Sequence, residues 1–356
     1  MKGEQKNFDF VDTIRCLSMM GIVFEHTEIF GAANYASIYT SFAQASVMQF
    51  FKFVTIAFFL IAGFLINHKF VDYTAFQYLK NRFKSTVGPW AFWLNMFILI
   101  NILGLLYVAY FKYNGERHMP SPFMKYLGDE YYNVIFNTSF WFIPNFLICI
   151  AILLAFKKYI YSLRFGLILG LATLFYSINL YYGWIRTQHT TALFGFVFFL
   201  WLGAYMNRYI DLLFNFIKKI SYFILVAITA GVFVLSNLEI IYLKSIGIED
   251  AYNTLRITNI LYSLSFFLIL LKIGSINNIN RIFKPRQTTY GIYLMHQIII
   301  LKVLSEIFRP FHLQVSTMTL FEAILYSFAR FILTYVIAYL IVNLILKTKF
   351  RWSIGA

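Results

Sequence analysis

The chain is 356 residues long, 60% hydrophobic and 21% aromatic, with a mean hydropathy of +0.68. Only 13% of its residues are charged, whereas a soluble domain carries about 25%, so the composition excludes an ordinary soluble domain. The net charge of +15 is high enough for a nucleic-acid-binding protein. However, the basic residues gather in short connections between apolar stretches, which is typical of a membrane protein. We therefore predict contact with membrane lipids and no nucleic-acid partner.

The sequence contains ten stretches that are long and apolar enough to span a membrane. In chain order their centres lie near Met20, Ala57, Phe97, Ile148, Leu171, Val197, Ile228, Ser265, Ile299 and Tyr335. Because the connections are short, we predict that residues 1–356 form a single polytopic domain, an all-α integral membrane bundle of about ten transmembrane helices.

With ten spans, most lysines and arginines lie on the side of the membrane that holds the N-terminus. The connections on the opposite side contain only Lys112, Arg117, Lys125, Arg186, Lys244, Arg256 and Arg309. Cytoplasmic loops are enriched in Lys and Arg, so this asymmetry places both termini in the cytoplasm.

The first apolar segment, VDTIRCLSMMGIVFEHTEIF, contains several ionisable residues. Arg15 and His26 are eleven residues apart, so on a helix they share one face and lie about 16 Å apart along the axis. Ionisable groups inside a spanning helix are costly and mark functional sites. These charges also interrupt the apolar run, so we predict a retained helix and not a cleaved secretory signal.

His26 is the predicted general base. A neutral imidazole accepts a proton from an alcohol near pH 7, which acyl transfer to a hydroxyl requires. The alternative is a histidine whose hydrogen bonds are satisfied by a neighbouring helix. Glu25 and Glu28 are candidates to orient the imidazole, as a carboxylate does in a catalytic dyad. Because Glu25 is adjacent to His26 in sequence and points elsewhere, another helix is an equally open source of that partner.

Arg15 lies about a turn and a half inside the N-terminal boundary of the same helix. It is placed either to pair with Asp12, three residues earlier, or to bind an anionic ligand from the cytoplasm. Lys80, Arg82 and Lys84 form a second basic group on that side, and arginine binds phosphate oxygens bidentately. Arg15 and this second basic group are the candidate binding site for a phosphate-bearing donor. The alternative for residues 80–84 is that their charge only reflects the enrichment of Lys and Arg in cytoplasmic loops.

The longest outer connection, from about Phe111 to Ser139, is rich in tyrosine. Candidates for stacking on sugar rings are Tyr126, Tyr131, Tyr132 and Trp141, and an interfacial aromatic belt explains them equally well. The spacing of Gly166 and Gly170 is typical of close helix packing.

Several common catalytic motifs are missing from the sequence. It contains no Walker loop, no GxGxxG, no HExxH and no GxSxG. Cys16 and Cys149 have no metal-ligand spacing, so we predict no metal site and no permanently bound cofactor. Without a nucleotide-hydrolysis motif, a primary pump is not expected.

Five phrases of the sequence together resemble the membrane acyltransferase 3 family. They are FVDTIRCLSMMGIVFEH, AFFLIAGFLI, YLKNRFKSTVGPW, SFWFIPNFL and TTYGIYLMH. They occur in the order of the family and cover essentially the whole chain. Two positions depart from the family pattern: Ala62 stands where a serine is usual, and Ser85 stands at the second arginine of an RxxR motif.

The resemblance implies a ten-helix enzyme of the bacterial inner membrane that takes an acyl group, commonly acetyl, from cytoplasmic acyl-CoA to a hydroxyl, usually on a carbohydrate. Arg15 and His26 match the essential pair of the family, and Arg82 matches the first arginine of RxxR. Lys84 is a substitute source of charge near Ser85 but lacks the planar fork. His296 matches a recurring histidine with a supporting role. No SGNH esterase-like domain follows, so the chain is similar to the stand-alone type.

We therefore expect an O-acyltransferase, first an O-acetyltransferase, acting on a surface polysaccharide, a lipid-linked glycan or a secreted small molecule. The alternative is a transporter or flippase for a glycan or lipid precursor, although such proteins often show inverted repeats and none is evident here. A third possibility is an assembly subunit, in which Arg15 and His26 would tolerate substitution. The sequence specifies no oligomeric state.

Overall fold

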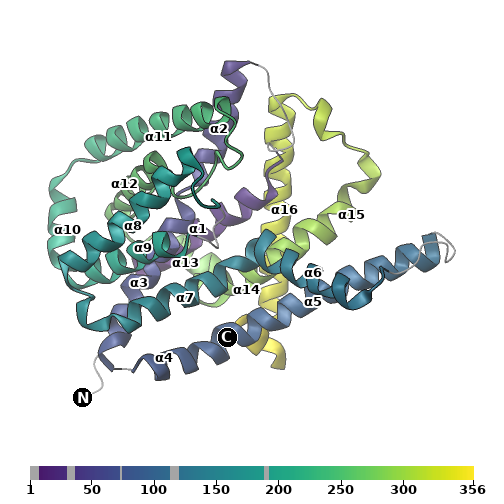
Figure 1. The fold of residues 1–356 in the computed structure, drawn as a ribbon, viewed down its shortest axis with the longest axis horizontal. Helices are drawn as coiled ribbons and strands as arrows, with labels where there is room; N and C mark the ends of the chain where they lie inside the picture. Colours follow the sequence, from purple (N-terminus) through teal and green to yellow (C-terminus); the bar gives the residue numbers. More distant parts are fainter. Residues whose placement is uncertain (1–7, 30–36, 73, 113–119, 188–191) are drawn as a thin grey trace.

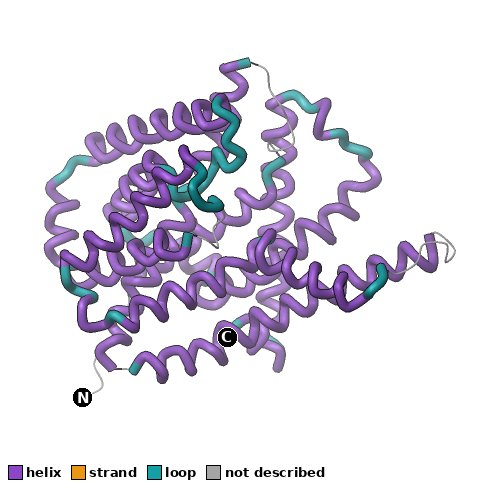
Figure 2. Tube along the Cα trace, in the orientation of Figure 1, coloured by secondary structure: helices purple, strands orange, loops and turns teal. Residues whose placement is uncertain are grey.

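The computed structural model describes residues 8–29, 37–72, 74–112, 120–187 and 192–356, and these residues form helices with no strand among them (Figures 1 and 2). The α-helices are α1 Asp9–Thr27, α2 Ile38–Phe51, α3 Val54–Asp72, α4 Ala75–Arg82, α5 Gly88–Tyr107, α6 Phe123–Asn137, α7 Phe142–Ala155, α8 Leu163–Tyr182, α9 Leu193–Arg208, α10 Ile210–Lys219, α11 Tyr222–Ser245, α12 Ile257–Ile273, α13 Asn277–Phe283, α14 Pro285–Ile298, α15 Leu304–Phe308 and α16 Leu320–Leu346. π-Helical turns at Phe83–Val87, Val108–Lys112 and Ile299–Val303 continue α4, α5 and α14.

Within the described ranges, six helical segments are long and apolar enough to cross a membrane. They are Ile38–Ile66, Phe76–Tyr110, Leu163–Tyr182, Tyr222–Ser245, Pro285–Phe311 and Leu320–Leu346. Three bent pairs, α6 with the segment to Ala155, α9 with α10, and α12 with α13, raise the number to nine if each pair is one span. The protein is thus a multi-pass, all-helical membrane protein, while ten spans and cytoplasmic termini stay predictions.

The helix that carries Arg15 and His26, α1, lies in the middle of the bundle (Figure 1). It contacts α2, α3, α12, α13, α14 and α16, and most of its residues are buried. Because α1 is enclosed by neighbours, several of its polar residues, among them Asp12, Thr13 and Ser18, are buried in protein. This enclosure allows a charged helix to exist inside an otherwise apolar bundle.

Close packing of α3 and α9 depends on two glycines. A Cβ atom added to Gly63 would lie 2.0 Å from the Leu200 carbonyl oxygen, and one added to Gly203 would lie 2.0 Å from the Leu60 oxygen. Each backbone therefore occupies the space where the other helix would need a side chain. The packing interpretation of Gly166 is confirmed in the same way, because a Cβ there would lie 2.1 Å from the indole of Trp201.

The outer connection predicted from Phe111 to Ser139 contains a helix, α6, which runs beside α5 (Figure 1). Residues 113–119 of this connection lie outside the described residues. The Tyr131 hydroxyl donates a hydrogen bond to Asn95 Oδ1 at 2.6 Å, so this side chain joins α6 to α5. Tyr132 is exposed. The connection is therefore helical over Phe123–Asn137, where α6 packs against α5.

The beginnings of α1 and α14 are held next to each other. The Thr13 hydroxyl donates to Asn280 Oδ1 at 3.1 Å and accepts from the Ile276 N–H at 2.9 Å, which fastens α1 to α13. Lys284 then adopts a left-handed conformation (φ 47°), and Pro285 begins α14. Proline suits the first position of a helix because its missing N–H has no partner there. The first turn of α14 is thereby placed beside the first turns of α1.

Candidate active site

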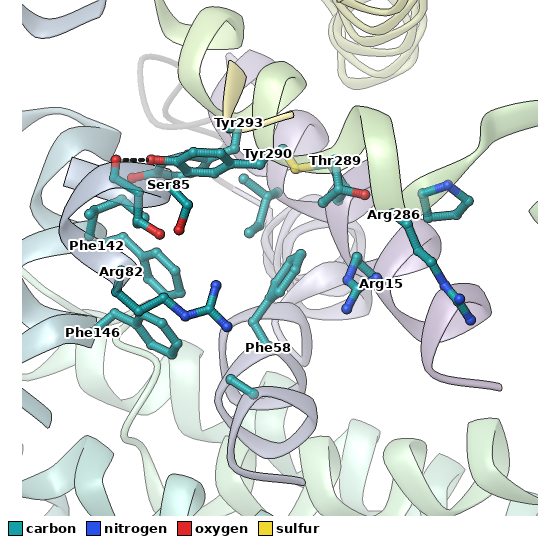
Figure 3. A pocket seen from close by; sticks show the side chains of 17 residues that line it. Arg15, Phe58, Arg82, Ser85, Phe142, Phe146, Arg286, Thr289, Tyr290 and Tyr293 are labelled. Atoms are coloured by element: carbon teal, nitrogen blue, oxygen red, sulfur yellow. Dashed lines mark hydrogen bonds between the residues drawn. The ribbon is translucent and has the colours of Figure 1, made fainter. Parts of the chain in front are cut away.

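A cavity of about 330 Å³ opens where α1, α3, α7, α14 and the α4–α5 junction meet (Figure 3). Its lining residues are Arg15, Met19, Ile22, Phe58, Ala62, Arg82, Ser85, Thr86, Phe142, Ile143, Phe146, Pro285, Arg286, Thr289, Tyr290, Tyr293 and Gly355. A smaller hollow of about 170 Å³ shares Arg15, Arg82 and Phe58 and extends along α3. The walls are mostly apolar, and three arginines supply the charge.

Two of these arginines are joined by one carboxylate. Arg15 Nη1 lies 2.9 Å from Asp12 Oδ1, and Arg286 Nε lies 2.6 Å from Asp12 Oδ2. Arg286 also approaches Asp9, at 3.5 Å. Arg15 therefore pairs with Asp12, which is one of the two alternatives from the sequence. The same arginine also lines the cavity. Asp12 orients both guanidinium groups and offsets their mutual repulsion.

Arg82 enters the cavity from the other side of Phe58 (Figure 3). Its Nε donates to the Tyr78 hydroxyl at 3.1 Å, and its guanidinium carbon lies 5.3 Å from the centre of the same ring. This pair of contacts fixes the long side chain against α4. The cavity thus has guanidinium groups on opposite walls.

The two lysines that flank Arg82 lie elsewhere. Lys80 and Lys84 are exposed and are not among the residues that line the cavity. Ser85, at the position of the second motif arginine, does line it, and its hydroxyl donates to the Asn81 carbonyl at 3.1 Å. Within the basic stretch, only Arg82 brings a positive charge to the cavity.

Two histidines lie together beyond the inner end of the cavity. The rings of His26 and His296 have their centres 5.2 Å apart. On α1 the cavity-lining residues Arg15, Met19 and Ile22 continue at helical spacing to His26, and on α14 those up to Tyr293 continue to His296. Each histidine is therefore one helical turn past the last lining residue of its helix.

The last turn of α1 is fixed by α16. Arg330 Nε donates to the Thr27 carbonyl oxygen at 2.9 Å, and the Ile29 N–H donates to Ser327 Oγ at 3.3 Å. These bonds satisfy backbone groups at a helix end. They also hold the turn that carries His26.

His296 is fully buried, with 0% of its surface exposed. Its Nδ1 lies 2.6 Å from the Tyr293 carbonyl oxygen. Since a carbonyl only accepts, Nδ1 carries the proton and the lone pair of the neutral ring is on Nε2. Nε2 has no hydrogen-bond partner among the described residues. The Tyr293 hydroxyl in turn donates to the Ser139 carbonyl oxygen at 2.5 Å.

Of the two acidic residues near His26 in sequence, Glu25 is directed to another helix. Glu25 Oε1 lies 3.6 Å from Lys52 Nζ at the end of α2. Glu28 is the C-cap residue of α1, and its N–H bonds to the Phe24 carbonyl oxygen. Trp141 packs against Phe142 and Phe196, behind the cavity wall.

Arg286 lies in a basic connection of the sequence, and its position in the cavity was not predicted. A signal was present: Arg286 precedes His296 on α14 by ten residues, much as Arg15 precedes His26 on α1 by eleven. Both helices thus carry an arginine at the start and a histidine three turns later. In the described part of the chain, no group of three His, Cys, Asp or Glu side chains is arranged to hold a metal ion.

Comparison with known proteins assigns the chain to a family. The family model described as an acyltransferase domain, that of membrane acyltransferase 3, matches residues 8–342. The chain therefore belongs to this family and is an acyltransferase that transfers groups other than aminoacyl groups. No curated protein and no solved structure matches it.

Proposed function

Because the chain belongs to the membrane acyltransferase 3 family, we propose that it is an O-acyltransferase that takes an acyl group, first acetyl, from cytoplasmic acyl-CoA. The acceptor is a hydroxyl of a surface polysaccharide, a lipid-linked glycan or a secreted small molecule, and the site of action is the bacterial inner membrane. One observation carries the proposal: a cavity lined by three arginines ends one turn short of two adjacent histidines.

The negative charges of the donor phosphates determine where the donor binds in this proposal. Arg15, Arg82 and Arg286 provide forked donors for phosphate oxygens. The apolar walls between them, including Phe58 and Phe146, suit the uncharged arm that separates the phosphates from the thioester. With its phosphates at the arginines, the donor extends along α1 and α14 toward the histidines.

The chemistry requires one general base. His26 takes the proton of the acceptor hydroxyl as the oxygen attacks the thioester carbonyl carbon. The new C–O bond forms, the C–S bond breaks, and the CoA thiolate leaves. His26 returns the proton to this thiolate, so the histidine is neutral again at the end of the cycle.

The decisive experiment compares the wild-type protein with His26→Ala in membrane vesicles supplied with radiolabelled acetyl-CoA. We expect acetyl transfer to membrane glycans to fall by about 10²- to 10⁴-fold, as for loss of a general base, with an unchanged amount of folded protein and unchanged CoA binding. Retained transfer would remove His26 from the mechanism. If the wild-type protein binds no acyl-CoA, transport of a glycan or lipid precursor replaces acyl transfer.

Mass spectrometry of cell-surface glycans with and without the protein identifies the acyl group. An increase of about 42 Da per modified hydroxyl is the mass of acetyl replacing hydrogen, a value fixed by the covalent chemistry of the modification. A different increment would replace acetyl by another acyl group, and no increment on any glycan would point to a secreted small-molecule acceptor.

A further inference from the structure

The sequence leaves open which group orients His26, and the structure narrows the choice. The nearest acid in sequence, Glu25, is directed to Lys52. The ring that lies beside His26 is that of His296, which comes from α14, 270 positions later in the chain. A neighbour so distant in sequence is brought there by the packing of α14 on α1.

The protonation of His296 is set by its own helix. Its Nδ1–H is committed to the Tyr293 carbonyl oxygen at 2.6 Å, which leaves Nε2 as an acceptor in a fully buried position. Nε2 has no partner in the described part of the chain. A buried acceptor without a donor is costly, so Nε2 gains stability when a neighbouring group donates to it.

The spacing of the two rings suits a hydrogen bond between them. An imidazole nitrogen lies about 1.1 Å from its ring centre, and a nitrogen–nitrogen hydrogen bond is about 3 Å long, which together correspond to ring centres roughly 5 Å apart. The observed separation is 5.2 Å. At this separation, a rotamer of the exposed His26 ring that points a nitrogen at His296 places its N–H within hydrogen-bond reach of Nε2.

We propose that His296 is the positioning residue of a histidine pair: its Nε2 accepts a hydrogen bond from His26 when His26 carries the proton taken from the acceptor hydroxyl. His296 thereby does for His26 what a carboxylate does in a histidine–aspartate dyad. The inference rests on the proposed function, because it concerns the base of that reaction.

The proton balance of the step is simple. The acceptor hydroxyl loses its proton to one nitrogen of His26, and the other nitrogen, which already bears hydrogen, donates to His296 Nε2. His296 keeps its Nδ1 proton throughout, and no proton is transferred between the two rings. When the thiolate takes the proton back, His26 is neutral and its hydrogen bond to His296 weakens.

The test uses two substitutions of His296, one that keeps a hydrogen-bond acceptor at this position and one that removes it. His296→Gln places an amide oxygen near the position of Nε2 and keeps an acceptor, whereas His296→Phe keeps the ring volume and removes it. Measured in vesicles with radiolabelled acetyl-CoA, His296→Phe should lower the maximal transfer rate per folded protein by about 10- to 100-fold. The half-saturating acetyl-CoA concentration should change by less than about twofold, and His296→Gln should recover most of the rate.

Met295→Ala is the matched packing control. Met295 is buried on the same helix and does not line the cavity, so this change should lower thermal stability and leave the rate per folded protein unchanged. If His296→Phe behaves like Met295→Ala, or if Gln and Phe at position 296 give equal rates, the positioning role is overturned. The proposed function survives that result as long as His26→Ala is inactive. An inactive wild-type protein overturns both.

Discussion

The two cavity arginines that share Asp12 and the buried Arg256 all pair with a carboxylate, and yet they differ in exposure. The cavity arginines Arg15 and Arg286 share Asp12 and still face open space, with 21% and 47% of their side chains exposed. Arg256, the residue before α12, is 0% exposed and lines neither of the two hollows that Arg15 and Arg82 share. The first arrangement leaves donors for a ligand, and the second leaves none.

The hydrogen bonds of Arg256 show why it has no donor left for a ligand. Its Nε donates to the Asn253 carbonyl oxygen at 3.2 Å, one terminal nitrogen donates to the Ser236 carbonyl at 3.0 Å, and the other donates to Gln49 Oε1 at 2.5 Å. Glu239 lies 3.5 Å away and neutralises the charge. Burial lowers the pKa of Arg256 from its usual value, and the charge of Glu239 opposes that shift. This arginine connects α2, α11 and the loop before α12.

The largest effect expected from this comparison is on stability. Arg256→Leu leaves the buried Glu239 carboxylate without its counter-charge and Gln49 Oε1 without its donor, which costs about 3–5 kcal/mol of unfolding free energy. Thermal unfolding of the purified protein in detergent measures this loss. CoA affinity of the fraction that folds should be unchanged. A variant of wild-type stability, or one that loses only CoA binding, would show that Arg256 belongs with the cavity arginines.

A smaller effect, on binding, is expected at Arg286. Arg286→Gln removes a charged donor from the cavity and should weaken CoA binding by about 3- to 10-fold. The effect is small because solvent screens the charge of a half-exposed side chain. Isothermal titration with CoA in detergent measures the change. Arg281→Gln, on an exposed arginine of α13 outside the cavity, is the control and should bind CoA as the wild-type protein does. Equal loss in both variants would contradict a specific contact.

The smallest effect is expected at the exposed lysines. Lys80→Gln and Lys84→Gln remove charges that do not line the cavity, so screened long-range attraction is all that they can contribute. CoA affinity should fall by less than about twofold and only at low salt. A loss that persists at about 0.15 M salt, where the Debye length is about 8 Å, would mean that Lys84 makes a direct contact and replaces the arginine absent at Ser85.

The sequence by itself located the helices that contain the ten predicted centres and the residues that share a face of each one. Helical periodicity requires only the order of residues along one segment, and all ten predicted centres lie in helical segments. For this reason the sequence predicted that Arg15 and His26 share a helix face. It also contained the family phrases, and the match over residues 8–342 confirms the family.

Only the tertiary structure decided which faces meet. The contact of Arg286 with Asp12 joins residues 274 positions apart, and the approach of His296 to His26 spans 270 positions. Neither is encoded by spacing along one helix, because helix neighbours depend on packing such as the glycine contacts of α3 with α9. The same packing directs Glu25 to Lys52 and leaves Lys84 outside. The sequence thus placed the reactive residues on their helices, and packing set their partners.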